Sequence, residues 1–221
     1  MKNLKARAIA IHETLIEAFG EPVWRTPLPA IDELVSTILS QNTNDINRDR
    51  GFNALHAKFP TWEVVRDAKT EDVINAIRPA GLANQKGPRI QQVLRAITEE
   101  RGSLNLDFLA GLPVKEARAW LTKFNGVGPK TAAIVLCFSL NMPAFPVDTH
   151  IYRVSGRTGL RPEKMTVEQA HPHLESLFPP ETYYAAHLNL IRLGRETCGA
   201  RKPNCPKCPI IKLCEYKEKT K

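Results

Sequence analysis

The sequence has no apolar run long enough to cross a membrane. The longest, residues 132–140, is about half of the roughly 18 residues that a span requires. Charged residues interrupt the first fifteen positions, MKNLKARAIAIHETL, which therefore do not resemble a signal peptide. We expect a soluble, cytoplasmic protein that does not bind membranes.

The sequence also lacks internal repeats, low-complexity tracts and any sustained alternation of apolar and polar residues. Such alternation is the pattern of a half-buried strand. Apolar residues recur instead at helical spacing, as at Ile31, Leu34, Val35, Ile38 and Leu39. With 221 residues, 43% of them apolar, the chain can bury a core as one domain or as two small ones. These features predict an all-α fold of about ten short helices.

Acidic residues are in deficit, with 23 Asp and Glu against 31 Lys and Arg, which gives a formal charge of +8 and a pI near 9.4. A basic protein of this size suggests a polyanionic partner, and nucleic acid fits better than membrane if the charge gathers on one face. The alternative is a solvated, lysine-rich surface without a binding role.

A glycine hairpin, Asn125-Gly126-Val127-Gly128, follows an amphipathic segment, and Pro129 opens the next helix with Lys130 in its first turn. Two closely spaced glycines allow positive φ and leave no side chain between the backbone amides and a bound group. Proline is tolerated at the first helical position. The free amides and positive dipole end of this helix predict a seat for an anion such as phosphate. Asp148, eighteen residues after Lys130, precedes a helical segment that it can cap.

Further patterns mark the ends of predicted helices. The wholly polar sequence SQNTND, residues 40–45, predicts a loop, and PAGLAN, residues 79–84, predicts a turn. Thr61 and Thr70 are each predicted to cap the helix that follows. Thr166 and Gln169 have the spacing of a capping box.

Cysteine is scarce before the C-terminal segment, where four of the five fall in a C-x6-C-x2-C-x5-C pattern: Cys198, Cys205, Cys208 and Cys214. This short segment has too few apolar residues to hold itself by packing, so a metal centre bound by four thiolates would stabilise it. The spacing favours an iron–sulfur cluster over zinc, because structural zinc sites prefer two C-x2-C pairs or mixed Cys and His ligands. Disulfides are the third alternative. Cys137 lies in an apolar segment and is expected to be a buried small hydrophobe.

The hairpin NGVGPK, the sequence VDTH at residues 147–150 and the cysteine pattern together closely resemble the endonuclease III family of helix-hairpin-helix DNA glycosylases. The resemblance covers nearly the whole chain, because the polar loop 40–45 and the GLANQK turn also have counterparts there. It implies two helical domains flanking a DNA-binding cleft. One is a six-helix domain at residues 25–138, and the other combines residues 1–24 and 139–221 and carries a [4Fe-4S] cluster in loop 198–214, bound by the four cysteines named above.

By position, Lys130 corresponds to the family's catalytic lysine and Asp148 to its catalytic aspartate. A neutral Lys130 amine would attack C1′ of the sugar and form a Schiff base, and β-elimination would then cut the strand. Burial and the helix dipole would lower the pKa of this lysine from its usual value near 10.4. Asp148 would stabilise the cationic sugar and help deprotonate Lys130. The alternatives are a phosphate contact for Lys130 and a simple cap for Asp148.

The resemblance also implies contacts with double-stranded DNA that holds a damaged base or an abasic site. The damaged nucleotide would rotate out of the duplex, and protein side chains would fill the gap. Backbone amides and basic side chains would grip phosphates without reading sequence. His150 either lines the pocket or packs as a structural histidine. The expected DNA-contact residues are Gln41 or, preferably, Asn42 as the polar filler, Leu82 as the apolar one, His150, the hairpin residues Gly126, Val127 and Gly128, and Arg201 and Lys202.

The expected function is therefore that of a monomeric, bifunctional DNA glycosylase and AP lyase of base-excision repair, acting on damaged and by resemblance oxidised pyrimidines. It would associate with the nucleoid in a bacterium or archaeon. Asn125 replaces the family's usual proline and Pro129 a common basic residue, so one phosphate contact would be weaker. One alternative is a monofunctional mismatch glycosylase, whose members generally lack a lysine at the position of Lys130. The other is a non-catalytic DNA-binding iron–sulfur module, against which Asp148 argues.

Overall fold

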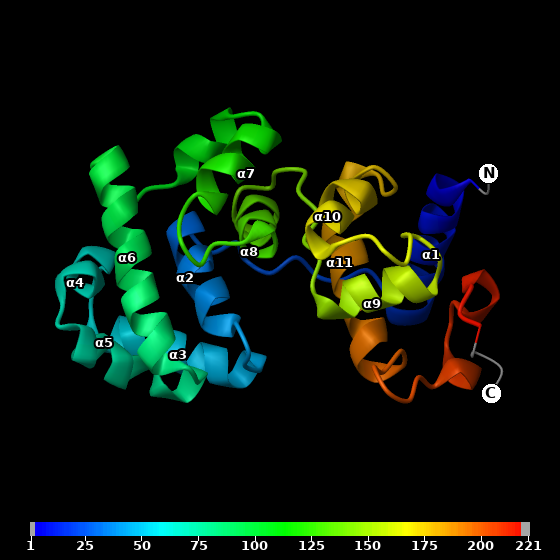
Figure 1. The fold of residues 1–221 in the computed structure, drawn as a ribbon, viewed down its shortest axis with the longest axis horizontal. Helices are drawn as coiled ribbons and strands as arrows, with labels where there is room; N and C mark the ends of the chain where they lie inside the picture. The colour runs from blue at the N-terminus through cyan, green and yellow to red at the C-terminus, as the bar shows by residue number, and fades with distance from the viewer. Residues whose placement is uncertain (1–2, 218–221) are drawn as a thin grey trace. The chain divides into compact units, whose positions relative to one another are not determined.

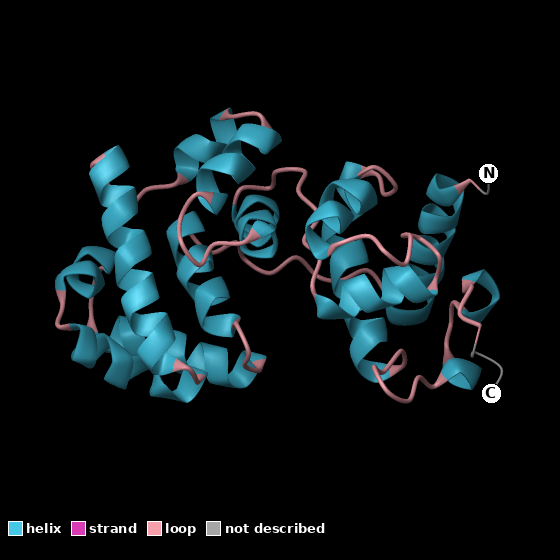
Figure 2. Ribbon diagram, viewed as in Figure 1, coloured by secondary structure: helices cyan, strands magenta, loops and turns pink. Residues whose placement is uncertain are grey.

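Figure 1 shows the computed structural model, which describes residues 3–217. These residues form eleven α-helices with short 3₁₀ and π-helical turns, and no strand occurs among them (Figure 2). The predicted all-α class is confirmed. None of the described helices is both long and apolar enough for a membrane span. The chain divides into two compact units, Pro27–Met142 and the combination of Met1–Thr26 with Pro143–Lys221.

The Pro27–Met142 unit is built around two helices. α2 is almost wholly buried, and the predicted apolar stripe, including Leu34, Ile38 and Leu39, is fully buried. It packs against α3 and α8, while the long helix α6 packs against α4 and α5. The helices of this unit are α2 (Ala30–Ser40), α3 (Asp45–Lys58), α4 (Trp62–Asp67), α5 (Thr70–Ile77), α6 (Ala83–Arg101), α7 (Val114–Thr122) and α8 (Pro129–Ile134).

Short turns extend or connect these helices. The 3₁₀ turn η1 (Arg78–Ala80) leads from α5 towards α6, and η2 (Asp107–Gly111) lies between α6 and α7. The π-helical turn η3 (Val135–Ser139) continues α8 without a break. Cys137 is buried in this turn, which confirms the prediction that it serves as a small hydrophobic residue.

The other unit has α11 at its centre, packed against α1 and α9. The rings of Phe145 and Phe178 are stacked at 5.2 Å, and Tyr183 meets Phe145 edge to face. These aromatic residues are all buried and form part of the unit's core. Its helices are α1 (Leu4–Phe19), α9 (Thr149–Arg157), α10 (Val167–Glu175) and α11 (Tyr183–Glu196), with 3₁₀ turns η4 (Pro180–Thr182), η5 (Cys205–Lys207) and η6 (Ile211–Leu213).

Two of the three predicted threonine caps are confirmed. The Thr61 hydroxyl accepts a hydrogen bond from the N–H of Val64, and Thr166 forms the full capping box with Gln169. The prediction for Thr70 is wrong, because Thr70 is the first residue of α5 and its hydroxyl donates to Gln91 Oε1 at 2.7 Å.

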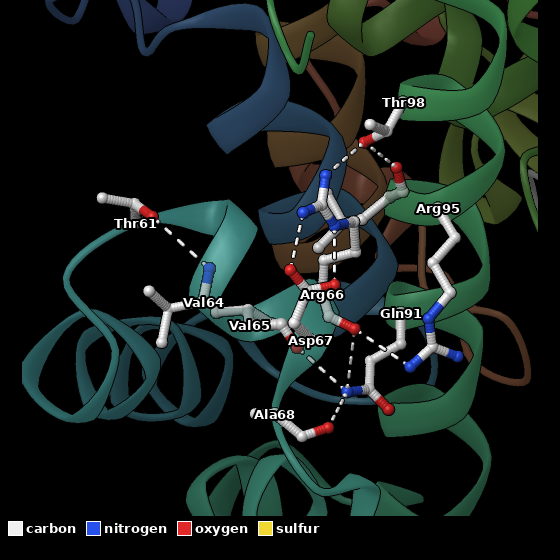
Figure 3. A network of polar contacts seen from close by, with 10 residues as sticks. Thr61, Val64, Val65, Arg66, Asp67, Ala68, Gln91, Arg95 and Thr98 are labelled. Carbon is white, nitrogen blue, oxygen red and sulfur yellow. Dashed lines mark hydrogen bonds and ion pairs between the residues drawn. The ribbon is translucent and has the colours of Figure 1, made fainter. Parts of the chain in front are cut away.

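A buried amide on α6 explains why Thr70 does not cap its helix. The Gln91 side chain donates to the carbonyls of Val65 and Ala68, at 2.9 and 2.8 Å, and Figure 3 shows it pointing at both. Its oxygen needs a donor of its own, and the Thr70 hydroxyl supplies one. Gln91 therefore joins α6 to the ends of α4 and α5.

Candidate active site

The hairpin between α7 and α8 depends on a glycine at position 126. Gly126 has φ +90°, and a Cβ atom there would lie 2.2 Å from Cδ of Arg89. Gly128 differs, because its φ is −88° and a Cβ would meet nothing within 4 Å. The prediction that both glycines permit positive φ is therefore wrong for Gly128. An open surface beside its backbone remains, which suits the approach of a bound group.

One backbone amide of the hairpin, that of Val127, is engaged in a hydrogen bond within the turn. The N–H of Val127 donates to the carbonyl of Phe124 at 3.0 Å, and the Val127 side chain is buried. The prediction that this amide grips DNA is therefore corrected, since the N–H is engaged inside the turn. Lys130 follows in the first turn of α8, half-buried, two residues after the exposed Gly128.

The polar loop after α2 distinguishes its two candidate side chains. The Gln41 amide donates to the carbonyl of Gly126 at 3.3 Å, and its oxygen accepts from Nη1 of Arg89 at 3.0 Å. Asn42 is exposed and has φ +53°. The structure thus joins Gln41 to the hairpin and presents Asn42 to the solvent.

The turn before α6 presents an apolar side chain outward. Leu82 is 46% exposed and has φ +51°, a conformation that is uncommon for a residue with a branched side chain. It follows Gly81, which also has positive φ, and it is the residue from which α6 begins. The placement of Leu82 at the surface is compatible with its predicted role as a filler.

Sequence reasoning missed two residues of α6 that support these loops. The ammonium of Lys86 donates to the carbonyls of Leu39 and Ala80, at 2.6 and 2.8 Å, and the side chain is only 1% exposed. Burial lowers the pKa of Lys86. Arg89, one turn further, holds Gln41. Lysine and arginine are usually exposed, and their partners here lie far away in the sequence. The roles of Lys86 and Arg89 were therefore not predictable.

In the other unit, Asp148 is the N-cap of α9. Its Oδ1 accepts a hydrogen bond from the N–H of Ile151 at 2.8 Å, and the residue is half-buried. His150 lies against Gly194 of α11, where an added Cβ would come within 2.7 Å of His150 Cβ. Nδ1 of His150 is 3.1 Å from the guanidinium of Arg153, which also donates to the carbonyl of Gly194. The contacts of His150 within its unit are therefore those of a packed residue.

The cysteine segment is joined to α9 by Arg157, another residue that the sequence did not reveal. Its guanidinium donates to Sγ of Cys198 at 3.3 Å and to the carbonyls of Gly199 and Ala200. Its own carbonyl lies 3.4 Å from Sγ of Cys214. Burial opposes the charge of Arg157, but Cys198 and its neighbours raise the pKa above its ordinary value. The first and last cysteines of the pattern thus meet at one arginine.

The two central cysteines lie on the turn η5 and directly after it. Burial, with smaller contributions from the charges of Cys198, Cys214 and Cys205, raises the pKa of the Cys208 thiol to about 11. Four thiols are a donor set that suits a soft, thiolate-bound centre. Across residues 3–217, no three His, Cys, Asp or Glu side chains form a group that could hold a metal ion. No disulfide joins any of the five cysteines, all of which are described.

The loop between the first two cysteines carries Arg201 and Lys202, and both are exposed. A backbone bond from the N–H of Asn204 to the carbonyl of Thr197, at 2.8 Å, closes this loop. The two basic side chains therefore face solvent from a closed turn, as the sequence predicts.

Residues 35–180 match a sequence model described as the HhH-GPD superfamily of base excision DNA repair proteins. The chain is 37% identical over 216 residues to endonuclease III of Escherichia coli K12, which covers 97% of this chain and 98% of that protein. It is 32% identical to endonuclease III of Thermotoga maritima, and the match covers 83% of this chain and 81% of that protein. A solved non-covalent endonuclease III–DNA complex matches with a TM-score of 0.80 and 27% identity, over 95% of this chain and 94% of that one.

Proposed function

The chain belongs to the HhH-GPD superfamily of base excision DNA repair proteins, as a DNA glycosylase of the endonuclease III type, and on that premise we propose that it is bifunctional. It removes a damaged base and then cuts the strand as an AP lyase. Its substrate is double-stranded DNA that holds a damaged base or an abasic site, and it acts as a monomer. Oxidised pyrimidines are the substrate class that the likeness to endonuclease III supports.

The observation that carries the proposal is the position of Lys130 in the first turn of α8, directly behind the open backbone of Gly128. An unprotonated Nζ attacks C1′, and the glycosidic bond breaks with its electron pair leaving on the base. The nitrogen then loses a proton, the C1′–O4′ bond breaks as the C1′=N bond forms, and the ring oxygen takes up a proton, which gives a ring-opened Schiff base. Loss of a C2′ proton next expels the 3′ phosphate, and water hydrolyses the imine to release the enzyme.

Asp148 supplies the negative charge that this chemistry requires. Its carboxylate stabilises the cationic sugar as the base leaves and accepts a proton from the lysine. The hydrogen bond from Ile151 uses one carboxylate oxygen and fixes the orientation of the group. Capping and catalysis are therefore compatible roles, because a held carboxylate needs no reorganisation during the reaction.

Reaching the sugar requires the damaged nucleotide to leave the base stack. Asn42 and Leu82 fill the space that it leaves, the first as a hydrogen-bonding side chain and the second as an apolar wedge. The exposure of both side chains, and the engagement of Gln41 by Arg89 and Gly126, support this assignment. His150 keeps its structural contact with Arg153. It lies in the first turn of α9, two residues after Asp148, and this position alone brings it near the pocket.

The four cysteines Cys198, Cys205, Cys208 and Cys214 would hold a [4Fe-4S] cluster. The cluster, when bound, supplies stability to a segment that packs few apolar residues. The spacing of the four cysteines and the cation of Arg157 beside Cys198 support this ligand set. The loop then presents Arg201 and Lys202 to the phosphate backbone. At the hairpin, the backbone of Gly126 and Gly128 contacts phosphate as well.

Borohydride trapping on abasic DNA tests the nucleophile. The wild-type protein should give a covalent complex, and Lys130→Ala should give none. Lys115→Ala is the matched control, because Lys115 is an exposed lysine on the neighbouring helix α7 and should trap fully. Full trapping by Lys130→Ala would reject the assignment. A panel of duplexes with one lesion each identifies the preferred base, and base release without strand cutting by the wild type would indicate a monofunctional enzyme.

A further inference from the structure

Two of the segments proposed to enter DNA are attached to the same buried side chain. We propose that Lys86 is a positioning residue for base extrusion: by binding the backbone before Asn42 and before Leu82, it sets the separation of the two side chains that replace the damaged nucleotide. This inference rests on the proposed function and extends it to a residue that touches no DNA.

The contacts of Lys86 are with backbone on both sides. Its ammonium donates to the carbonyl of Leu39, three residues before Asn42, and to that of Ala80, two residues before Leu82. Its own backbone N–H donates to the carbonyl of Leu82 at 3.0 Å. The short turn that carries Leu82 is therefore bound at both ends by one residue.

A lysine is an unusual choice for this place. Lysine is almost never fully buried unless it is paired, because removing an ammonium from water is costly. Lys86 is nevertheless among the largest fully buried side chains of the described residues. A leucine or methionine would fill the same volume without that cost. What an ammonium adds is three donors on one atom, which can hold carbonyls from two segments at once.

A residue with strained backbone follows each of the two carbonyls that Lys86 binds. Only three non-glycine residues among those described have positive φ, and Asn42 and Leu82 are two of them. Such conformations persist where the surrounding structure over-determines them, and they concentrate at functional sites. Lys86 binds the chain three residues before Asn42 and two residues before Leu82, so it is well placed to maintain both conformations.

The next turn of α6 extends the same arrangement to the hairpin. Arg89 donates to Gln41, and Gln41 donates to the carbonyl of Gly126. One helix therefore holds all three DNA-facing segments of its unit, with Lys86 on the two filler loops and Arg89 on the link to the hairpin.

The experiment compares the lyase rate on an abasic site in duplex DNA with the rate on the same site in single-stranded DNA, which needs no extrusion. Lys86→Met gives an unbranched apolar side chain one atom shorter and removes both hydrogen bonds of the ammonium. The matched control is Gln91→Met, because Gln91 is equally buried on α6 and also binds backbone carbonyls, but those of Val65 and Ala68 (Figure 3).

Lys86→Met should lower the duplex rate by about tenfold to a hundredfold, since small misplacements of positioning groups cost that much, and change the single-strand rate less than about threefold. Gln91→Met should lower the melting temperature without changing the ratio of the two rates. Equal losses on both substrates, or the same ratio change in Gln91→Met, would reduce Lys86 to a structural role and overturn the proposal.

A second readout separates this inference from the proposed chemistry. The fluorescence of 2-aminopurine placed opposite a stable abasic analogue rises when protein side chains disturb the stack, and it requires binding only. Lys86→Met should reduce this rise at saturating protein, and an undiminished rise would refute the proposal. This result holds even if the wild type proves to have no lyase activity, which would reject the proposed function instead. Lys86→Gln, which retains donors on a shorter chain, should fold and give an intermediate signal.

Discussion

Oδ1 of Asp148 accepts a hydrogen bond from the backbone N–H of Ile151 at 2.8 Å, so the proposed catalytic carboxylate is also the cap of helix α9. An asparagine retains an oxygen for the cap but has no charge. We therefore expect Asp148→Asn to change the free energy of unfolding by less than about 0.5 kcal/mol while lowering turnover by a hundredfold or more.

Asp148→Ala separates the two roles further. It removes the cap as well as the charge, so it should lose about 1 kcal/mol of stability in urea unfolding in addition to turnover. Duplex binding should survive in both variants, as measured by a gel-shift titration. A fully active Asp148→Asn protein would show that the carboxylate acts only as a cap.

The neighbouring residues Gln41 and Asn42 should respond differently to truncation. Asn42→Ala removes an exposed side chain, so the fold should be unaffected while the duplex glycosylase rate falls about tenfold or more. Gln41→Ala removes the link between Arg89 and Gly126 and should lower the melting temperature, because two hydrogen-bonding groups lose their partner. Thermal melting and single-turnover kinetics on one lesion duplex measure both effects. If Gln41→Ala alone lost activity at unchanged stability, Gln41 would be the filler.

Local sequence patterns predicted most of the helices but not the contacts between them. The stripe from Ile31 to Leu39 is buried as expected, because helical spacing places those residues on one face. The predicted cap at Thr70 does not form, because its hydroxyl donates to Gln91, which is 21 residues away. Lys86 and Arg89 reach carbonyl and amide groups on α2 and the loop after it, 47 and 48 residues away. Propensity and periodicity describe neighbours in the chain, and they carry no information on such partners.

The candidate site shows the same division between local and long-range information. Its residue types and spacings, including Lys130, Asp148 and the four cysteines, are legible in the sequence and carry the resemblance. Which amide of the hairpin is already engaged, and which of Gln41 and Asn42 is exposed, depend on three-dimensional packing. These details decide which side chains can meet a ligand.

The two hairpin glycines should differ in the effect of alanine. Gly126→Ala places a Cβ at positive φ and against Arg89, so we expect a loss of about 1–3 kcal/mol in unfolding free energy. Gly128→Ala has an ordinary φ and open space, so stability should stay within about 0.5 kcal/mol while affinity for duplex DNA falls. Urea unfolding and fluorescence anisotropy at fixed salt measure the two quantities. Unchanged DNA affinity in Gly128→Ala would place the phosphate contact elsewhere.

Iron content tests the ligand set. Cys205→Ser should give protein with little iron and without the brown colour of an iron–sulfur cluster, because one of four thiolates is lost. Cys137→Ala is the control, since Cys137 is buried in η3 and should leave the iron content unchanged. Metal analysis and the visible absorption spectrum provide the measurements. Stoichiometric zinc in the wild-type protein would instead support the zinc alternative.

The buried ammonium of Lys86 should make stability depend on pH in a specific direction. Burial lowers its pKa in the folded protein, whereas the unfolded chain keeps a value near 10.4. Between these two values the unfolded state binds more protons, so the free energy of unfolding rises with pH, by at most about 1.4 kcal/mol per pH unit. Below the folded value, the whole cost of burying the charge is present.

Lys86→Met lacks this titrating group. The difference in unfolding free energy between wild type and variant therefore isolates the pH-dependent contribution of Lys86. That difference should shift in favour of the wild type as the pH rises from 7 towards 10, since the neutral amine still donates to the carbonyls of Leu39 and Ala80. Urea unfolding of both proteins at unit steps of pH measures the trend. A difference that stayed flat would mean that the Lys86 ammonium is not destabilised by its surroundings. A difference that moved against the wild type would mean that its charge contributes net stability to the anchor.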